Sequence, residues 1–327
     1  MILSSFSFSI KEKNRKDAFQ HLYKSFEDKK ILMNVVQDLL LLSAQTVTKR
    51  KMDSHPIIII NSLKNILSDN INTPSIDILK YIVDILIDCS FRENDENIIS
   101  STLDSGVGLS AFVGELEDAL QNSKWAESQK LAAKIYLASD RSPSIIETLC
   151  SIAIQNVEVN VLIVHNLLRA YYFQNNKDNV WSYAMCLLNI MKMEALPKPK
   201  KRKSVDLNLV KRDILYSSNA LDWVIFSAVS RIWEGNYIRI NSYKRELSNW
   251  VFSLQISKKE INKEDKFPQN INFIKIIESL IAKKIDYKTK YSDIIKIESL
   301  RYYFKYGNKE QSLVAYSNLI KSGYISR

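Results

Sequence analysis

Residues 74–91, PSIDILKYIVDILIDCSF, carry the clearest fold signal in the chain. The polar residues Asp77, Lys80, Asp84 and Asp88 follow one another at spacings of three, four and four, and nearly every other residue is apolar. Such spacings place side chains on one face of an α-helix. We therefore predict a helix that exposes one narrow polar stripe and is covered on its other sides, as in a layered stack of helices.

Helical periodicity continues through most of the 327 residues, and the chain contains only six glycines and six prolines. A sheet protein needs more turn residues, so we predict an all-α protein of about fourteen helices, either an irregular helical-repeat (solenoid-like) array or a multi-helix bundle. Loops are expected at 92–105, 196–205 and 257–270. The predicted helices cover residues 12–27, 31–50, 56–69, 74–91, 109–121, 124–139, 143–156, 159–175, 178–195, 206–233, 236–256, 271–285, 289–306 and 309–322.

Some helix ends are marked by their capping residues. Pro56 and Pro74 stand where a first helical turn needs no N–H group, and Thr73 occupies the predicted N-cap position before Pro74. Asn308, followed three residues later by Gln311, has the pattern of a capping box. Gly323 is predicted to end the last helix.

The charge is unevenly distributed. Residues 1–195 contain 20 Lys and Arg against 23 Asp and Glu, whereas residues 196–327 contain 26 against 13, so the net charges are −3 and +13. We predict a mildly acidic helical array over 1–195, a basic exposed linker over 196–205 and a basic helical region over 206–327. The positive excess either serves an anionic partner or reflects the lysine-rich composition of an AT-rich genome.

The boundary is the stretch LPKPKKRKSVD, residues 196–206. Its two prolines disfavour a helix, so we expect an exposed, extended segment. Clustered cations after a proline have the form of a short nuclear import signal, and the same properties suit a solvated linker. Both hypotheses stay open for the cations Lys198, Lys200, Lys201, Arg202 and Lys203.

The cysteine pattern and the apolar runs indicate the compartment. Cys89, Cys150 and Cys186 lie far apart in apolar helical contexts, which is typical of reduced core thiols. No apolar run approaches the roughly 18 residues that a membrane span requires. We expect an intracellular protein, cytoplasmic or nuclear, that is neither secreted nor membrane-bound.

Catalytic signals are weak. A helical metal site could in principle gather His21, His55 and His165 with Asp84 or Asp88 as a carboxylate ligand. No two of the histidines have the spacing that would place them on one helix face, so three unrelated histidines are the competing interpretation. No cofactor is predicted, and nothing in the sequence favours an enzyme.

The basic region interleaves cations with aromatic residues, a pattern found where rings stack on bases and cations neutralise phosphates. The same pattern fits a solvated basic face. Trp223, Phe226 and Trp233 share an apolar helix face and are predicted to be core. The candidate nucleic-acid contacts are Arg239, Lys244, Arg245, Arg301 and Lys305.

Residues 294–327, IIKIESLRYYFKYGNKEQSLVAYSNLIKSGYISR, resemble the start of the winged-helix tail of PCI domains. The resemblance rests on the apolar residues from Ile294 to Leu300, a helix ending at Leu319-Ile320, and Gly323-Tyr324-Ile325. It covers about a tenth of the chain, and its motif is loose. The resemblance implies a helical scaffold module of a multiprotein complex, whereas a final capped helix of an array explains the same residues.

Three functions follow from these observations. The leading hypothesis is a non-enzymatic helical scaffold that binds a protein partner through an extended helical surface. The alternative is a nucleic-acid-associated helical protein, PCI-like in its tail, that uses the basic region on phosphates. The third, from another class, is a helical metalloenzyme that uses the three histidines.

Overall fold

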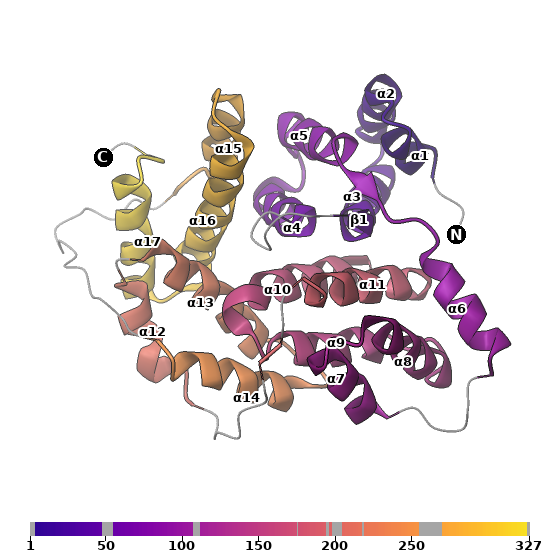
Figure 1. The fold of residues 1–327 in the computed structure, drawn as a ribbon. Coiled ribbons are helices and arrows are strands. Elements are labelled where there is room, and N and C mark those ends of the chain that lie inside the picture. The colour runs from indigo at the N-terminus through magenta and orange to yellow at the C-terminus, as the bar shows by residue number, and fades with distance from the viewer. Residues whose placement is uncertain are drawn as a thin grey trace.

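A computed structural model describes residues 4–47, 55–106, 112–174, 176–193, 196–197, 205–217, 219–254 and 270–325. These residues form 17 α-helices, two short 3₁₀ helices, and one antiparallel pair of two-residue strands (Figure 1). The all-α prediction is confirmed. Within the described ranges, no helix combines the length and the apolar character needed to cross a bilayer.

The helices and strands follow one another along the chain in the order used in Figure 1. Their bounds are α1 Ser5–Lys11, α2 Arg15–Ser25, α3 Lys29–Gln45, β1 Thr46–Val47, α4 Pro56–Leu67, η2 Ser68–Asn70, α5 Ile76–Ile87, β2 Ser90–Phe91, α6 Asp95–Asp104, α7 Val113–Gln121, α8 Trp125–Ala138, α9 Ser144–Ala153, α10 Val157–Gln174, η3 Lys177–Asn179, α11 Val180–Met191, α12 Asn208–Leu215, α13 Ala220–Trp233, α14 Ile240–Val251, α15 Phe273–Ala282, α16 Tyr287–Tyr306 and α17 Lys309–Lys321.

Helix α5 has the predicted polar stripe. Asp77 and Asp88 are exposed and Lys80 and Asp84 are half-buried, while the apolar residues of the helix are buried or half-buried. The Asp84 carboxylate accepts two hydrogen bonds from the guanidinium of Arg15 on α2, at 2.6 and 2.8 Å. The stripe therefore faces solvent and also holds an ion pair between two helices.

The capping residues mostly act as predicted. Pro56 opens α4 as predicted, and α17 has the complete capping box of Asn308 and Gln311. The cap of α4 was not predicted: it is His55, whose Nδ1 accepts the N–H of Ile57 at 3.2 Å. Gly323 adopts a left-handed φ of 70° just after α17. The Thr73 cap is wrong: α5 begins two residues later than expected, and Ser75 caps it through the N–H of Ile78.

Three helices separate the 17 observed from the 14 predicted. Helix α1 was not expected, and the segment predicted as one helix over 206–233 is split into α12 and α13, because Asn219 caps α13 through the N–H of Leu221. The loop predicted at 92–105 is wrong, since most of it forms α6. Helix α6 starts after Asn94, whose φ of 62° turns the chain away from β2.

Arg92 connects α6 to the rest of the molecule. Its side chain is largely buried and pairs with Asp95 at 3.1 Å. It also donates to the carbonyls of Ala44 and Ser182, at 2.8 and 3.0 Å, which belong to α3 and α11. The backbone N–H of Arg92 donates to the carbonyl of Gln45 at 2.7 Å. One residue therefore joins the C-terminal end of α3, the strand pair, α6 and α11.

The helices on either side of the basic stretch pack against one another. In Figure 1, α13 lies beside α10 and α16 runs beside α4, in agreement with the contacts between these pairs, and α14 also contacts α10. Buried apolar residues from both regions belong to one core cluster. The division at 196–205 rests on charge, and as a domain boundary it stays a prediction.

The basic stretch itself lies mostly outside the described residues. At its ends, Leu196 is buried and the N–H of Val205 donates to Ser248 Oγ at 2.9 Å. The cations proposed as an import signal are not among the described residues, so that hypothesis stays a prediction. They are Lys198, Lys200, Lys201, Arg202 and Lys203.

The three thiols are in the expected surroundings. Cys150 and Cys186 are buried and Cys89 is half-buried, and none of them forms a disulfide. Burial is the main cause that raises the pKa of Cys186 to about 12, so this thiol stays protonated.

Candidate ligand-binding cleft

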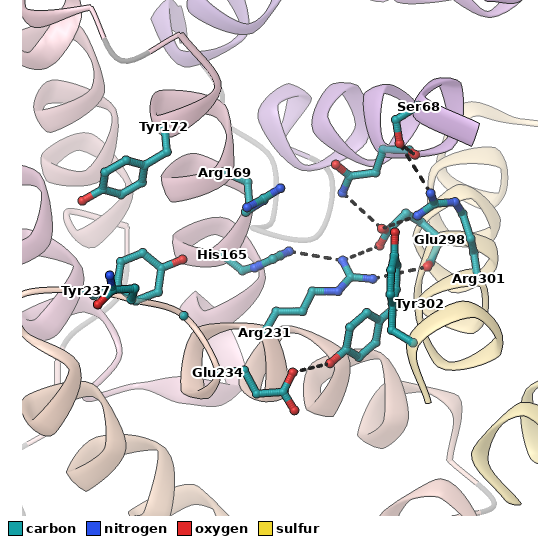
Figure 2. A pocket seen from close by; sticks show the side chains of 14 residues that line it. Ser68, His165, Arg169, Tyr172, Arg231, Glu234, Tyr237, Glu298, Arg301 and Tyr302 are labelled. Atoms are coloured by element: carbon teal, nitrogen blue, oxygen red, sulfur yellow. Dashed lines mark hydrogen bonds and ion pairs between the residues drawn. The ribbon is translucent and has the colours of Figure 1, made fainter. Parts of the chain in front are cut away.

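A cleft of about 520 Å³ opens where helices from both sides of the basic stretch meet (Figure 2). Its walls come from α4 and η2, from α10, from α13 with the turn that follows it, and from α16. We call it the tyrosine–arginine cleft, after the side chains that dominate its lining. The lining residues are Asn65, Ser68, His165, Arg169, Tyr172, Arg231, Glu234, Gly235, Asn236, Tyr237, Glu298, Arg301, Tyr302 and Tyr306.

Helical spacing explains why these residues meet. On α10, His165, Arg169 and Tyr172 are four and three residues apart, so their side chains lie on one helix face. On α16, Arg301 and Tyr302 follow Glu298 by three and four residues, and Tyr306 follows Tyr302 by four. The two faces point toward each other across Arg231 of α13 (Figure 2).

Arg231 and Glu298 form the base of the cleft. Arg231 Nη1 donates to Glu298 Oε2 at 2.8 Å, and both side chains are largely buried. Asn65 Nδ2 donates to the other carboxylate oxygen at 3.1 Å. The guanidinium carbon of Arg231 also lies 4.2 Å from the ring centroid of Tyr302, a cation–π contact. These contacts hold Arg231 in one orientation.

His165 contacts the same guanidinium. Its Nε2 lies 3.2 Å from Arg231 Nη1, and because a guanidinium only donates, Nε2 accepts and Nδ1 carries the proton. Nδ1 is buried and has no hydrogen-bond partner among the described residues. Burial, followed by the charges of Arg231 and Arg169, lowers the pKa of His165 well below its usual value. The imidazole is therefore neutral at physiological pH.

Two of the predicted nucleic-acid contacts meet at one carboxylate beside the cleft. Arg301 Nε lies 2.9 Å from both oxygens of Asp69, and Lys305 Nζ lies 2.7 Å from Asp69 Oδ1. The Arg301 side chain is only 5% exposed. The positive charge of Arg301 is therefore paired with Asp69 inside the protein, where a phosphate in solvent has little access to it.

Two other cations have no carboxylate partner within the described ranges. Arg169 is exposed, extends into the cleft in Figure 2, and forms no hydrogen bond or ion pair with any described residue. Lys64 lies one residue before Asn65, with its Nζ 4.8 Å from the ring centroid of Phe173. Burial, followed by the charge of Arg169, lowers the pKa of Lys64 to about 7.

Tyrosines flank the cations on both sides. Tyr172 and Tyr237 lie on one side and Tyr302 on the opposite side (Figure 2). Tyr172 and Tyr237 form a tilted pair with ring centroids 5.9 Å apart, and Tyr302 forms another with Tyr306 at the same separation. Tyr172 and Tyr306 are 41% and 70% exposed. The cleft thus offers accessible aromatic surface next to an uncommitted guanidinium.

The charges in and beside the cleft do not balance. Glu147 belongs to this group, because its Oε1 accepts the hydroxyl of the cleft-lining Tyr172 at 2.6 Å. Five cationic side chains then stand against four carboxylates, which leaves one positive charge when Lys64 is protonated. Arg169 and Lys64 are the two cations of the group without an ion pair among the described residues. The cations are Lys64, Arg169, Arg231, Arg301 and Lys305, and the carboxylates are Asp69, Glu147, Glu234 and Glu298.

Comparison of this chain with protein-family models, with curated proteins and with solved structures yields no match. The function of the cleft therefore has to be argued from its own chemistry.

The other candidate nucleic-acid contacts lie on or next to α14 and do not line the cleft. Arg245 Nε pairs with Glu246 at 2.8 Å, and Lys244 Nζ lies 5.3 Å from the ring centroid of Trp233. The backbone N–H of Arg239 donates to Glu147 Oε2 at 3.0 Å. The structure therefore does not gather all five predicted contacts into one phosphate-binding surface.

The three histidines are not brought together either. His21 is half-buried on α2, His55 caps α4 with its Nε2 3.8 Å from Cys186 Sγ, and His165 lies in the cleft. Over the described part of the chain, no three His, Cys, Asp or Glu side chains are grouped to hold a metal ion. The geometry gives no support to the metalloenzyme hypothesis.

Most residues of the cleft were not predicted from the sequence. Arg169 and Arg231 were not singled out, although each interrupts an apolar helix, in LIVHNLLRAYY and VIFSAVSRIW. A lone cation within such a run is a usable signal, because a helix that is otherwise buried must direct that charge toward a partner or a cavity. Lys64 gives the same signal in IIIINSLKNIL.

Proposed function

We propose that this protein is a helical scaffold that binds an acidic segment of a partner protein in the tyrosine–arginine cleft. The single observation that carries the proposal is the positive excess of the cleft, where Arg169 stands uncommitted between two pairs of tyrosines. The proposal keeps the protein-binding scaffold expected from the sequence. It assigns binding to a cleft rather than to an extended face.

The chemistry of the lining suits an acidic peptide. A free guanidinium binds a carboxylate through two parallel hydrogen bonds, which gives orientation as well as affinity. Tyrosine provides rigid contact area and a hydroxyl at little cost in conformational entropy. A volume of about 520 Å³ accommodates a few side chains of an extended segment.

The ionisable groups of the cleft favour binding over acid–base catalysis. A general acid or base works best with a pKa near the working pH and contact with its substrate. The imidazole of His165 is buried, and its pKa lies well below that range. Glu298 is buried and engaged by Arg231 and Asn65.

A calorimetric titration tests the proposal. The probe is the hexapeptide Gly-Glu-Glu-Glu-Glu-Gly, with the Gln analogue as its uncharged control, at about 50 mM salt, where surface charges are weakly screened. We expect the Glu peptide to bind and Arg169→Gln to weaken it about tenfold, the range for loss of a charge-assisted hydrogen bond.

Arg141→Gln is the matched control, because it removes an equal charge from an exposed arginine that lines a different cavity. It should leave the affinity unchanged. Equal binding of the Gln peptide, or equal weakening by both substitutions, would show that the cleft does not recognise an acidic segment.

Binding of single-stranded nucleic acid is the second candidate. It is favoured by the exposed rings of Tyr172 and Tyr306 near Arg169, since bases stack on such rings while arginine contacts phosphate. The commitment of Arg301, Lys305 and Arg245 to carboxylates weighs against it. Oligouridine and duplex DNA, titrated at about 50 and 200 mM salt, distinguish the two. Tight, salt-dependent RNA binding that Arg169→Gln abolishes would replace the protein-binding proposal.

A further inference from the structure

Two cations without ion pairs indicate which acidic group the cleft takes. One carboxylate bound at Arg169 would pair with that guanidinium and leave Lys64, beside the cleft, without an anion. A phosphate monoester carries a charge of about −1.5 to −2 near neutral pH and has three acceptor oxygens. A single such group carries enough negative charge to act on both cations.

The hydrogen-bond donors around the cleft also suit a phosphate monoester. All five N–H groups of the Arg169 guanidinium are uncommitted toward described residues, and arginine binds phosphate oxygens through parallel hydrogen bonds. Arg231 is held in place by Glu298 and Tyr302, so its charge is oriented before a ligand arrives. The exposed ring of Tyr172 offers contact area for the atoms next to the phosphate.

We propose that the acidic group held in the cleft is a phosphate monoester on a side chain of the partner segment; this inference rests on the proposed function. Phosphorylation of the partner would then control whether the scaffold binds it.

Lys64 couples this binding to pH. Its ammonium lies over Phe173 of α10, and the charges that act on it come from Arg169 on α10, Arg231 on α13, and Glu298 and Arg301 on α16. Burial is the main cause that lowers the pKa of Lys64 to about 7. The three positive charges act in the same direction, and the charge of Glu298 opposes them. A bound dianion raises that pKa again, so the complex takes up protons as it forms.

The experiment uses the full chain and the peptides Gly-Ser-Glu-X-Glu-Ser-Gly, in which X is serine, glutamate or phosphoserine. Calorimetry in HEPES at about pH 7 should give an affinity about tenfold higher for the phosphoserine peptide than for the glutamate peptide. Arg169→Gln should reduce that preference to about twofold, whereas Arg141→Gln should preserve it. Each variant's melting temperature is measured to show that it is folded.

The pH dependence gives an independent readout. Between about pH 7 and pH 8.5, where phosphoserine is already a dianion, its affinity should fall severalfold as free Lys64 loses its proton. In Lys64→Met the affinity should stay flat over this range. Titration in both HEPES and Tris should show a buffer-dependent heat from proton uptake in the wild type only.

Each other outcome has a definite meaning. Equal affinity for the glutamate and phosphoserine peptides overturns this inference and leaves the proposed function standing. Absence of binding by both peptides overturns the two together. Binding of AMP or inorganic phosphate as tightly as the phosphopeptide shows that the site takes a small phosphate compound, and this overturns the assignment to a partner segment.

Discussion

At the level of single residues, the structure places three basic side chains where their charged forms are disfavoured. His55 and His165 are buried, and Lys64 lies among several cations without a carboxylate partner among the described residues. A base whose pKa is lower in the folded than in the unfolded state binds fewer protons when folded. The free energy of unfolding then rises with pH between the two pKa values.

His55 should make the protein sensitive to acid. Burial, followed by the charge of Arg92, lowers the pKa of His55 to about 3 from its ordinary 6.5, so stability is lost as pH falls below about 6.5. Asparagine can cap α4 without titrating. Between about pH 7.5 and pH 5, His55→Asn should lose about 2 kcal/mol less unfolding free energy than the wild type.

Urea denaturation at the two pH values checks this prediction. The comparison within each protein removes any constant effect of the substitution, such as altered packing against Cys186. Parallel loss of stability in the wild type and the variant would show that His55 does not contribute to the acid sensitivity.

Lys64 should destabilise the folded chain at neutral pH. Its pKa of about 7 lies below the ordinary 10.5, so the cost is fully present below about pH 7 and is relieved as pH rises toward 10.5. Methionine has a similar length and no charge, and it packs well against a ring such as Phe173. Lys64→Met should raise the unfolding free energy at about pH 6, and the gain should shrink by roughly 2.5 kcal/mol at about pH 9.

Chemical denaturation at both pH values measures this difference. A gain that is constant with pH would mean that Lys64 has an ordinary pKa in the folded protein. In that case the pH dependence expected for phosphopeptide binding would fail as well.

At the level of elements, the sequence predicts helices well where an apolar pattern is strong. The pattern of residues 74–91 identified α5 and its polar stripe, because burial of the other sides decides that helix. Residues 92–105 lack such a pattern, and only Ile99 and Thr102 of α6 are buried. Helix α6 is held by long-range contacts of Arg92 and by Trp181, whose Nε1 donates to Asp95 O at 2.8 Å. Contacts of this kind are not visible in local sequence.

We therefore expect Arg92 to be essential for holding α6 against α3 and α11. A lysine at this position keeps the charge but has at most three donors, without the planar geometry that reaches Asp95, Ala44 and Ser182 together. We expect Arg92→Lys to lower the free energy of unfolding by about 3 kcal/mol, because it leaves buried polar groups unpaired. Arg141→Lys, at an exposed position, should change it by less than about 0.5 kcal/mol.

Urea unfolding followed by circular dichroism measures both variants. Hydrogen exchange should show the loss of protection spreading from α6 to the C-terminal end of α3. A cost below about 1 kcal/mol for Arg92→Lys would mean that these contacts are replaced by water without loss.

At the level of the whole molecule, the cleft depends on packing between distant parts of the chain. Arg169 of α10 and Glu298 of α16 belong to regions that the charge pattern separates, and they meet because α4 and α10 pack against α16 and α13. The sequence could indicate Arg169 as an unusual residue within an apolar helix. It could not show which residues would face it, because that depends on how helices far apart in sequence are arranged.

The shared core leads to a prediction for a chain that ends at residue 195. Such a fragment keeps α4 and α10 but loses α13 and α16, which cover them in the full chain. Exposed apolar faces of this kind reduce cooperativity and bind hydrophobic dyes. We expect the full chain to unfold in a single calorimetric transition, and the fragment to show a broad transition or none and to bind the dye ANS. A fragment with a sharp transition and no dye binding would mean that residues 1–195 fold independently, as the charge pattern alone suggests, and that the cleft is an interface between two domains.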